Sequence, residues 1–293
     1  NNNTTGISGV DWNAQLLSKN IEYSDDATTY QQIVDAVNYS PNVNVLNNSW
    51  GLINSDGSGG RYSTTVRLAF AYAYKMNRTA VVSMGNWNGS QTQYPAGFGQ
   101  GIIAIGSTDA SDVVAGSSDI GNHIDVSAPG VSILSTYRNG NFPGDANYHT
   151  TGGTSMAAPH VSGIASLLKG YNSNLYNDDI ENIIQLSTDK VRPDLYTYDA
   201  NGWNINVGYG RVNARKALNL LRAPVAFTQE TASGGGTVAQ TINYAGYFYG
   251  LPGAPDGYYI GKRYEIQKAI TFPLNSWRKV WGRGIATTGY NWS

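Results

Sequence analysis

The segment from Gly152 to His160, with the sequence GGTSMAAPH, constrains the fold of this chain more than any other stretch. Its two glycines permit a tight turn and a close approach of the backbone to other groups. Thr154 or Ser155 can then cap a helix, and Pro159 falls early in that helix, where a proline costs less than in the middle. Apolar residues follow at helical spacing, at positions 161, 164, 165, 167 and 168. The pattern predicts that Ser155 lies at the start of a buried helix.

A serine at such a place can be a simple helix cap or a nucleophile. The helix dipole favours negative charge at the N-terminus of the helix, so an oxyanion formed beside Ser155 would be stabilised there. A hydroxyl is nevertheless a poor nucleophile at neutral pH. It needs a base within hydrogen-bond reach, a group that orients this base, and donors for the oxyanion. The helix start alone leaves both interpretations open.

Short apolar runs alternate with helical patterns over the first 222 residues. The expected strands lie at 15–21, 42–47, 79–84, 101–106, 124–126 and 131–136, and further helices at 28–37, 62–76, 178–186 and 212–221. Strands that alternate with helices predict an α/β fold, a parallel doubly wound sheet covered on both faces. Beyond a glycine-rich link, residues 223–293 are rich in Tyr, Trp and Gly and predict a partial, β-rich C-terminal domain.

The composition excludes several classes of protein. Of the 293 residues 41% are hydrophobic and 13% charged, which favours a sizeable core over long disorder. The net charge of −1 argues against a partner nucleic acid. Cysteine is absent, so disulfides and a thiol nucleophile are excluded. No run is long and apolar enough to predict a membrane span, and the many Gly, Asn, Ser and Tyr residues are typical of loop-rich extracellular proteins.

The nine residues from Gly152 to His160 resemble the serine motif of the subtilases, the subtilisin-like serine peptidases, and ordered similarity extends from about residue 1 to residue 221. The resemblance implies a sheet of subtilisin type. It also implies a secreted or cell-surface endopeptidase that hydrolyses polypeptide substrates through an acyl-enzyme, with Ser155 as the nucleophile. No cofactor is required for that chemistry, and the complete protein is expected to be a monomer.

The other two members of the family's catalytic triad are not evident here. In the family the order along the chain is Asp, His, Ser, yet none of His123, His149 and His160 stands in the family's His-Gly-Thr setting. The segment 1–11 resembles the stretch that normally follows the histidine helix. The resemblance therefore predicts a peptidase domain, residues 1–222, that lacks its upstream Asp and His motifs and is inactive as an isolated chain. No signal peptide is visible, but the chain begins with Asn1 and not with Met.

Three loops that follow predicted strands resemble the family's substrate site. Asn86 ends the sequence SMGN and would donate its side-chain amide to the oxyanion, together with the N–H of Ser155. The segment Ser49, Trp50 and Gly51 would pair with an extended peptide as an added strand. Trp50 would form a wall of the pocket for a substrate side chain, and Tyr94 to Ala96 resemble the far wall of the primary pocket. Met84 and Gly85 are further candidate substrate-binding residues. Trp87 replaces a rim position that is often polar, which leaves the specificity open.

Some family members hold a cation near the last of these loops. The corresponding positions here are Ala96, Phe98, Ile102 and Asp125, so a structural calcium ion is possible by resemblance. A hard cation requires several oxygen ligands. Two features weaken the prediction: the loop is one residue longer than usual, and His123 stands where an acid would be expected.

Two alternatives from other functional classes stay open. The chain could be a peptide-binding pseudoenzyme that has lost its base, although intact Ser155 and Asn86 argue against such decay. It could also be a surface-adhesion protein whose tail is the functional part, with a binding face formed by aromatic and basic residues that include Lys262, Arg263, Arg278 and Lys279. The coding sequence upstream of Asn1 would discriminate among these possibilities.

Overall fold

The computed structural model describes residues 6–21, 26–39, 42–99, 101–137, 148–199 and 201–222. Further on it describes only four two-residue strands, β7 (Gln229–Glu230), β8 (Ile242–Asn243), β9 (Tyr247–Phe248) and β10 (Gly257–Tyr258). The rest of the expected β-rich region lies outside the described residues, including the four basic residues of its expected binding face. The boundary at residue 222 therefore stays a prediction.

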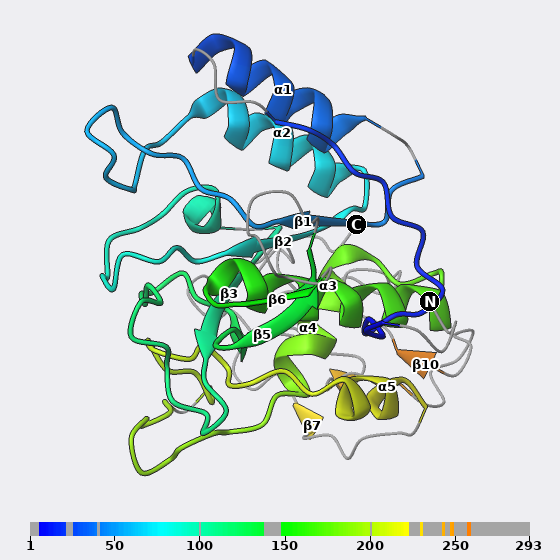
Figure 1. Cartoon of the computed structure of the whole chain (residues 1–293). Helices are drawn as coiled ribbons and strands as arrows, with labels where there is room; N and C mark the ends of the chain where they lie inside the picture. Colours follow the sequence, from blue (N-terminus) through cyan, green and yellow to red (C-terminus); the bar gives the residue numbers. More distant parts are fainter. Residues whose placement is uncertain are drawn as a thin grey trace, which may run out of the picture.

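A parallel sheet of four strands forms the centre of the fold (Figure 1). Its strands follow one another in sequence order: β1 (Val45–Asn48), β2 (Thr79–Ser83), β3 (Ile102–Thr108) and β4 (Val126–Pro129). All three pairings are parallel, with Val45 opposite Thr79, Ala80 opposite Ile102 and Ile105 opposite Val126. Every residue of β2 and β3 is buried, as expected for strands covered on both faces. The predicted parallel α/β fold is confirmed.

Helices cover both faces of this sheet (Figure 1). On one face α1 (Asp26–Asn38) packs on α2 (Thr64–Lys75), whose residues Val66, Ala69, Phe70 and Ala73 form one buried stripe. On the other face lie α3 (Thr154–Tyr171), α4 (Asn177–Leu186) and α5 (Ala214–Arg222). The side chains of β2 alternate between these layers: Val81 packs in the core beside α3, whereas Ala80 and Val82 pack in the core beside α1 and α2. This alternation is the period-two geometry of a strand.

Three smaller elements lie outside the sheet, one between β2 and β3 and two between β4 and α3. The 3₁₀ turn η1 (Ala96–Phe98) precedes β3, and the strands β5 (Ile133–Thr136) and β6 (Tyr148–Thr151) form an antiparallel pair before α3. The expected strand at 131–136 is thus shortened, and that at 124–126 is displaced to β4. Among the described helices, none is both long and apolar enough to cross a membrane.

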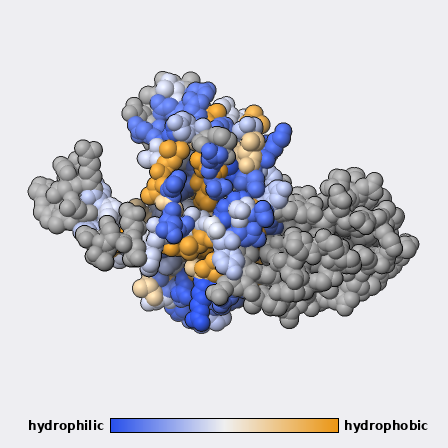
Figure 2. Space-filling view, turned by 90° about the vertical axis from the view of Figure 1, so that its right-hand side faces the viewer, coloured by the Kyte–Doolittle hydropathy of each residue, from blue (hydrophilic) through white to orange (hydrophobic). Residues whose placement is uncertain are grey.

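The strand predicted at 15–21 is wrong, because this segment is irregular. Leu16 is 95% exposed and Leu17 55%, and in the described part of the chain no strand pairs with them. The preceding residues run along α3 instead, where the Ser166 hydroxyl donates to the Asp11 carboxylate over 2.6 Å. Figure 2 shows the side of the molecule that lies at the right of Figure 1, and there hydrophobic patches alternate with hydrophilic residues.

A cluster of charges ties the segment after α4 to the start of α5. The backbones of Asp189 and Arg211 exchange two hydrogen bonds of 2.8 and 3.0 Å. The Asp189 carboxylate also accepts from Arg211 at 3.0 Å, from Asn213 at 3.0 Å and from Lys216 at 2.6 Å. Desolvation alone would raise the pKa of Asp189, but these donors outweigh it and lower the pKa from 3.8 to about 2. The ionised carboxylate therefore stabilises the folded state.

Acid should weaken this cluster. Because the folded pKa of Asp189 lies below the unfolded one, its stabilisation is fully present above about pH 4 and is lost as the pH falls towards 2. We expect Asp189→Asn to lower the melting temperature at pH 7, and to reduce the further loss of melting temperature between pH 5 and about pH 2. Asp194→Asn is the control, since the pair of Asp194 with Arg192 is mostly exposed. Equal acid sensitivity of wild type and Asp189→Asn would contradict the prediction.

Candidate active site

The segments that follow β1 and β2 meet the start of α3 at the carboxyl ends of the parallel strands. Ser49 directly follows β1, and residues 84–86 directly follow β2. Hydrogen bonds join both segments to α3: Ser49 bonds to Ser155, and Gly85 and Asn86 bond to Thr154. This edge is where ligands bind in open α/β sheets. The structure thus brings together the residues that the sequence places in the serine and oxyanion loops.

Ser155 lies half-buried in the first turn of α3. Its hydroxyl donates to the carbonyl oxygen of Ser49 over 3.3 Å, a long bond, while the Ser49 hydroxyl donates to the carbonyl of Ser155 over 2.8 Å. Within the described residues, the backbone N–H of Ser155 has no hydrogen-bond acceptor. An orphan N–H at the positive end of a helix is suited to bind an anion.

The cap of α3 differs from the prediction. Gly153 occupies the N-cap position, with φ of 138°, and no side chain of the cap itself bonds to the first turn. The capping oxygen comes from another element: Asn86 Oδ1 accepts from the Thr154 N–H at 2.9 Å and from the Thr154 hydroxyl at 3.1 Å. Thr154 and Ser155 are therefore capped residues and not caps. A side chain at Gly153 would meet the Asn86 amide at 3.2 Å, so the glycine makes room for this contact.

The bonds to Thr154 also orient the amide of Asn86. Since a backbone N–H can only donate, the atom that faces Thr154 must be the oxygen Oδ1. The nitrogen Nδ2 is then turned away from Thr154, on an exposed side chain, and makes no hydrogen bond to any described residue. Asn86 consequently presents two N–H donors next to the turn that holds Ser155.

The remaining substrate-site residues fall into two groups. Ser49, Trp50, Gly51, Gly85 and Tyr94 are half-buried, and the Leu52 N–H donates to the Tyr94 carbonyl over 2.7 Å, which joins the two segments. Trp50 packs with its ring centroid 6.2 Å from that of Phe70. In contrast, Met84 and Ala96 are 0% and 2% exposed and belong to the core beside α1 and α2. Only the first group presents surface to a peptide in this conformation.

None of the three histidines bonds to the Ser155 hydroxyl in the described part of the chain. The ring of His160 contacts the Met156 carbonyl at 2.9 Å within α3. The ring of His149, in β6, lies 5.3 Å from the ring of Tyr137. His123 lines a separate pocket, where burial lowers its pKa. The geometry therefore gives no local base for Ser155.

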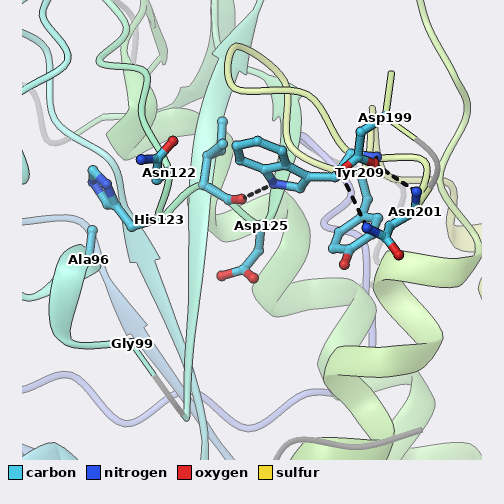
Figure 3. A pocket seen from close by; sticks show the side chains of 10 residues that line it. Ala96, Gly99, Asn122, His123, Asp125, Asp199, Asn201 and Tyr209 are labelled. Carbon is cyan, nitrogen blue, oxygen red and sulfur yellow. Dashed lines mark hydrogen bonds between the residues drawn. The ribbon is translucent and has the colours of Figure 1, made fainter. Parts of the chain in front are cut away.

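That separate pocket, of about 530 Å³, includes two of the four expected cation positions (Figure 3). His123 and Asn122 lie on one side of it and Asp199, Asn201 and Tyr209 on the other, with Asp125 between them. Of the expected set Ala96, Phe98, Ile102 and Asp125, only Asp125 is an acid. Its two oxygens already accept from the Ala104 N–H at 2.8 Å and from Gln185 at 3.0 Å.

This donor set fits a calcium ion poorly. Calcium prefers six to eight oxygen ligands, whereas this pocket is lined by His123, whose Nε2 is buried without a hydrogen-bond partner. The described residues include no group of three or more His, Cys, Asp or Glu side chains that could hold a metal ion. The structural calcium ion stays a prediction from resemblance, and nothing below depends on it.

One residue beside the site, Asp119, could not be identified from the sequence. Its side chain is fully buried and accepts from the backbone N–H groups of Trp87 and Gly89, at 3.0 and 2.9 Å. Residues 85–89 therefore depend on a carboxylate from the segment between β3 and β4. An aspartate in a polar loop has no periodic pattern that would single it out.

Comparisons with known proteins show the family of this chain. The model of the subtilase family matches residues 1–210. A thermophilic serine proteinase of Bacillus sp. (strain AK1) is 33% identical over 219 residues, which are 74% of this chain and 48% of the relative. Thermitase of Thermoactinomyces vulgaris is 30% identical over 217 residues, or 74% of this chain and 70% of the relative.

The solved structure of a Pseudoalteromonas arctica PAMC 21717 protease has a TM-score of 0.62 at 27% identity, and the alignment covers 74% of this chain and 66% of that one. This chain thus spans between about half and 70% of the length of these proteins. The match of the family model over most of the chain, together with these relatives, shows that the chain belongs to the subtilase family.

Proposed function

We propose that this chain is the serine-bearing part of a serine endopeptidase, with Ser155 as the nucleophile and Asn86 as an oxyanion donor. The observation that supports this most directly is the pair of donors at one turn. The orphan N–H of Ser155 and the Nδ2 of Asn86 are both left without an acceptor in the described structure, next to a hydroxyl at a helix start. Convergent donors of this kind stabilise a developing oxyanion.

The proposed reaction follows from these positions. The Ser155 oxygen attacks the carbonyl carbon of a peptide bond, and its proton passes to a base. The negative charge that develops on the carbonyl oxygen accepts hydrogen bonds from Asn86 and from the Ser155 N–H. Collapse of this intermediate breaks the C–N bond, and the leaving amine takes the proton from the base. Water then hydrolyses the acyl-enzyme, and no cofactor is needed.

The base and the group that orients it come, in this proposal, from residues outside this chain. The contacts of the Ser155 hydroxyl support this part of the proposal. The hydroxyl donates to the Ser49 carbonyl, and no histidine in the described part of the chain bonds to the hydroxyl. A carbonyl oxygen cannot accept the proton in the way an imidazole does, so the hydroxyl stays protonated. The absence of a local base also fits a peptide-binding pseudoenzyme, and the first experiment below separates the two.

The proposed substrate is an extended polypeptide that pairs with the backbone of Ser49, Trp50 and Gly51 as an added strand. Gly85 and Tyr94 would form the accessible walls of the primary pocket, with Met84 and Ala96 beneath them. We also propose that the protein acts outside the cell or on its surface. A relative from Xanthomonas campestris that is 36% identical over 176 residues is named an extracellular protease, which supports this location.

The first test concerns the base. We expect the isolated chain to react with a fluorophosphonate probe no faster than its Ser155→Ala variant, because no described residue other than the Ser49 carbonyl accepts a bond from the hydroxyl. The same chain expressed with its natural flanking sequence should label and cleave casein, and should lose both activities on Ser155→Ala. If the extended protein binds peptides but neither labels nor cleaves, the pseudoenzyme is correct and the proposal is wrong.

A second test uses the active protein, expressed with its natural flanking sequence (the extended protein). It separates the two roles of Asn86, as the cap of α3 and as the proposed oxyanion donor. Asn86→Ala removes both the cap of α3 and the oxyanion donor, so it should lower the unfolding free energy by about 1 kcal/mol. It should also lower kcat by about 10²–10³-fold, the effect of removing such a donor in subtilisin. Asn86→Asp keeps the capping oxygen, so it should lose the activity and keep the stability.

Asn88→Gly is the matched control for this pair, since Asn88 lies in the same loop with φ of 53°, which glycine also adopts. We expect it to retain kcat. Equal turnover of Asn86→Asp and wild type, measured on a fluorogenic peptide, would refute the oxyanion role.

A further inference from the structure

Asp119 is bonded to the loop 85–89 on both sides of Asn86. Before Asn86, the Gly85 carbonyl accepts from the Asp119 N–H over 3.0 Å. After it, Asp119 Oδ1 accepts from the N–H groups of Trp87 at 3.0 Å and Gly89 at 2.9 Å. The next residue, Ile120, also donates its N–H to the Gly89 carbonyl over 2.9 Å. Residues 119 and 120 thus hold the loop at three of its five residues, and the Ser117 carbonyl accepts from a fourth, the Asn88 N–H, over 3.0 Å.

The loop would not keep this shape unaided. Gly85 has φ of 111° and Asn88 has φ of 53°, values that most residues avoid. A side chain at position 85 would come within 2.3 Å of Asp119 Oδ2, so the carboxylate lies directly against the backbone before Asn86. A loop with two residues at positive φ needs outside contacts to select one conformation. Asp119, at 0% exposure, supplies those contacts from a fixed position.

We propose that Asp119 is a positioning residue, which holds the loop 85–89 so that the Nδ2 of Asn86 faces the oxyanion. The side chain of Asn86 is fixed at its tip by Thr154, and the neighbouring residues Gly85 and Trp87 are fixed by Asp119, so the Asn86 amide has one orientation. An oxyanion donor is effective when it needs no reorganisation during the reaction. This inference rests on the proposed function.

The second oxygen of Asp119 is consistent with this role. Oδ2 is buried and has no hydrogen-bond partner. Burial raises the pKa of Asp119, although the bonds from Gly89 and Trp87 oppose the shift. A proton on Oδ2 would leave Oδ1 free to accept from both amides, so positioning requires the acceptor and not the negative charge. Asparagine can therefore replace this aspartate, whereas alanine cannot.

The test uses the active extended protein and a fluorogenic peptide. We expect Asp119→Ala to lower kcat by about 10- to 100-fold, less than loss of the donor itself, and to leave KM within about threefold. Asp119→Asn should rescue kcat to within about threefold of wild type. Should Asp119→Ala fail to fold, Asp119→Ser takes its place, since its short side chain cannot reach both amides.

A double-mutant cycle then separates positioning from general stability. If Asp119 acts through Asn86, adding Asp119→Ala to Asn86→Ala should lower kcat no further. Asp109→Ala is the matched control: the Asp109 carboxylate also accepts from two backbone N–H groups, of Ser111 at 2.8 Å and Val113 at 2.9 Å, in a turn without Asn86. This control should reduce stability and leave kcat unchanged. If Asp119→Ala lowers kcat by the same factor in the wild type and in the Asn86→Ala variant, the inference is overturned.

A second measurement does not depend on activity and can be made on this chain. In ¹⁵N NMR spectra of wild type and Asp119→Asn, the amides of Trp87 and Gly89 should be protected from exchange, and the Asn86 side-chain amide should have dispersed shifts. In Asp119→Ala the protection should be lost and the Asn86 shifts should approach random-coil values. Unchanged Asn86 side-chain shifts in Asp119→Ala would refute the inference, whatever the activity of the protein. A lack of peptidase activity in the chain with its flanking sequence would refute only the proposed function.

Discussion

The hydrogen bond from the Thr154 N–H to Asn86 Oδ1 is the contact on which the rest of the candidate site depends. It satisfies one of the orphan donors of α3, which Gly153 has no side chain to satisfy. The same bond fixes which end of the Asn86 amide points away from the helix. One interaction thus couples the start of α3 to the residues after β2. Removing the Asn86 side chain therefore changes both the stability of the fold and the orientation of the N–H donors.

The sequence predicts the sheet well where burial alone decides the structure. β2 and β3 each contain a short apolar run close to turn residues, and such runs are typical of strands that are covered on both faces of a sheet. The serine turn was predictable as well, because glycines and small polar residues precede a helical pattern. The segment 15–21 has the composition of a strand too, yet it lies on the surface. A strand needs a neighbour to pair with, and a local pattern cannot show whether one is present.

The residues of the candidate site came from the family resemblance, and their roles stay a prediction. The structure confirms only that the loops of Asn86 and Ser155 meet, and the contacts that support these loops were not predictable. The capping role of Asn86 and the clamp by Asp119 are contacts between segments far apart in the chain, made by polar side chains without periodicity. The same limit applies to the cation positions: the sequence identifies Asp125, but only the structure shows that Ala104 and Gln185 already occupy its oxygens.

The state of the Ser155 hydroxyl follows from these contacts. Its bond to the Ser49 carbonyl is long, at 3.3 Å, so a base that approaches would compete with one weak interaction only. The two N–H groups of the proposed oxyanion site, in contrast, are already oriented: Thr154 orients the side chain of Asn86, and α3 orients the N–H of Ser155. Oriented oxyanion donors account for a large part of catalysis in acyl transfer. Here the N–H groups are oriented although no described residue acts as a base for Ser155. In the proposed mechanism, the sheet and α3 therefore position the oxyanion donors, and proton transfer is a separate requirement.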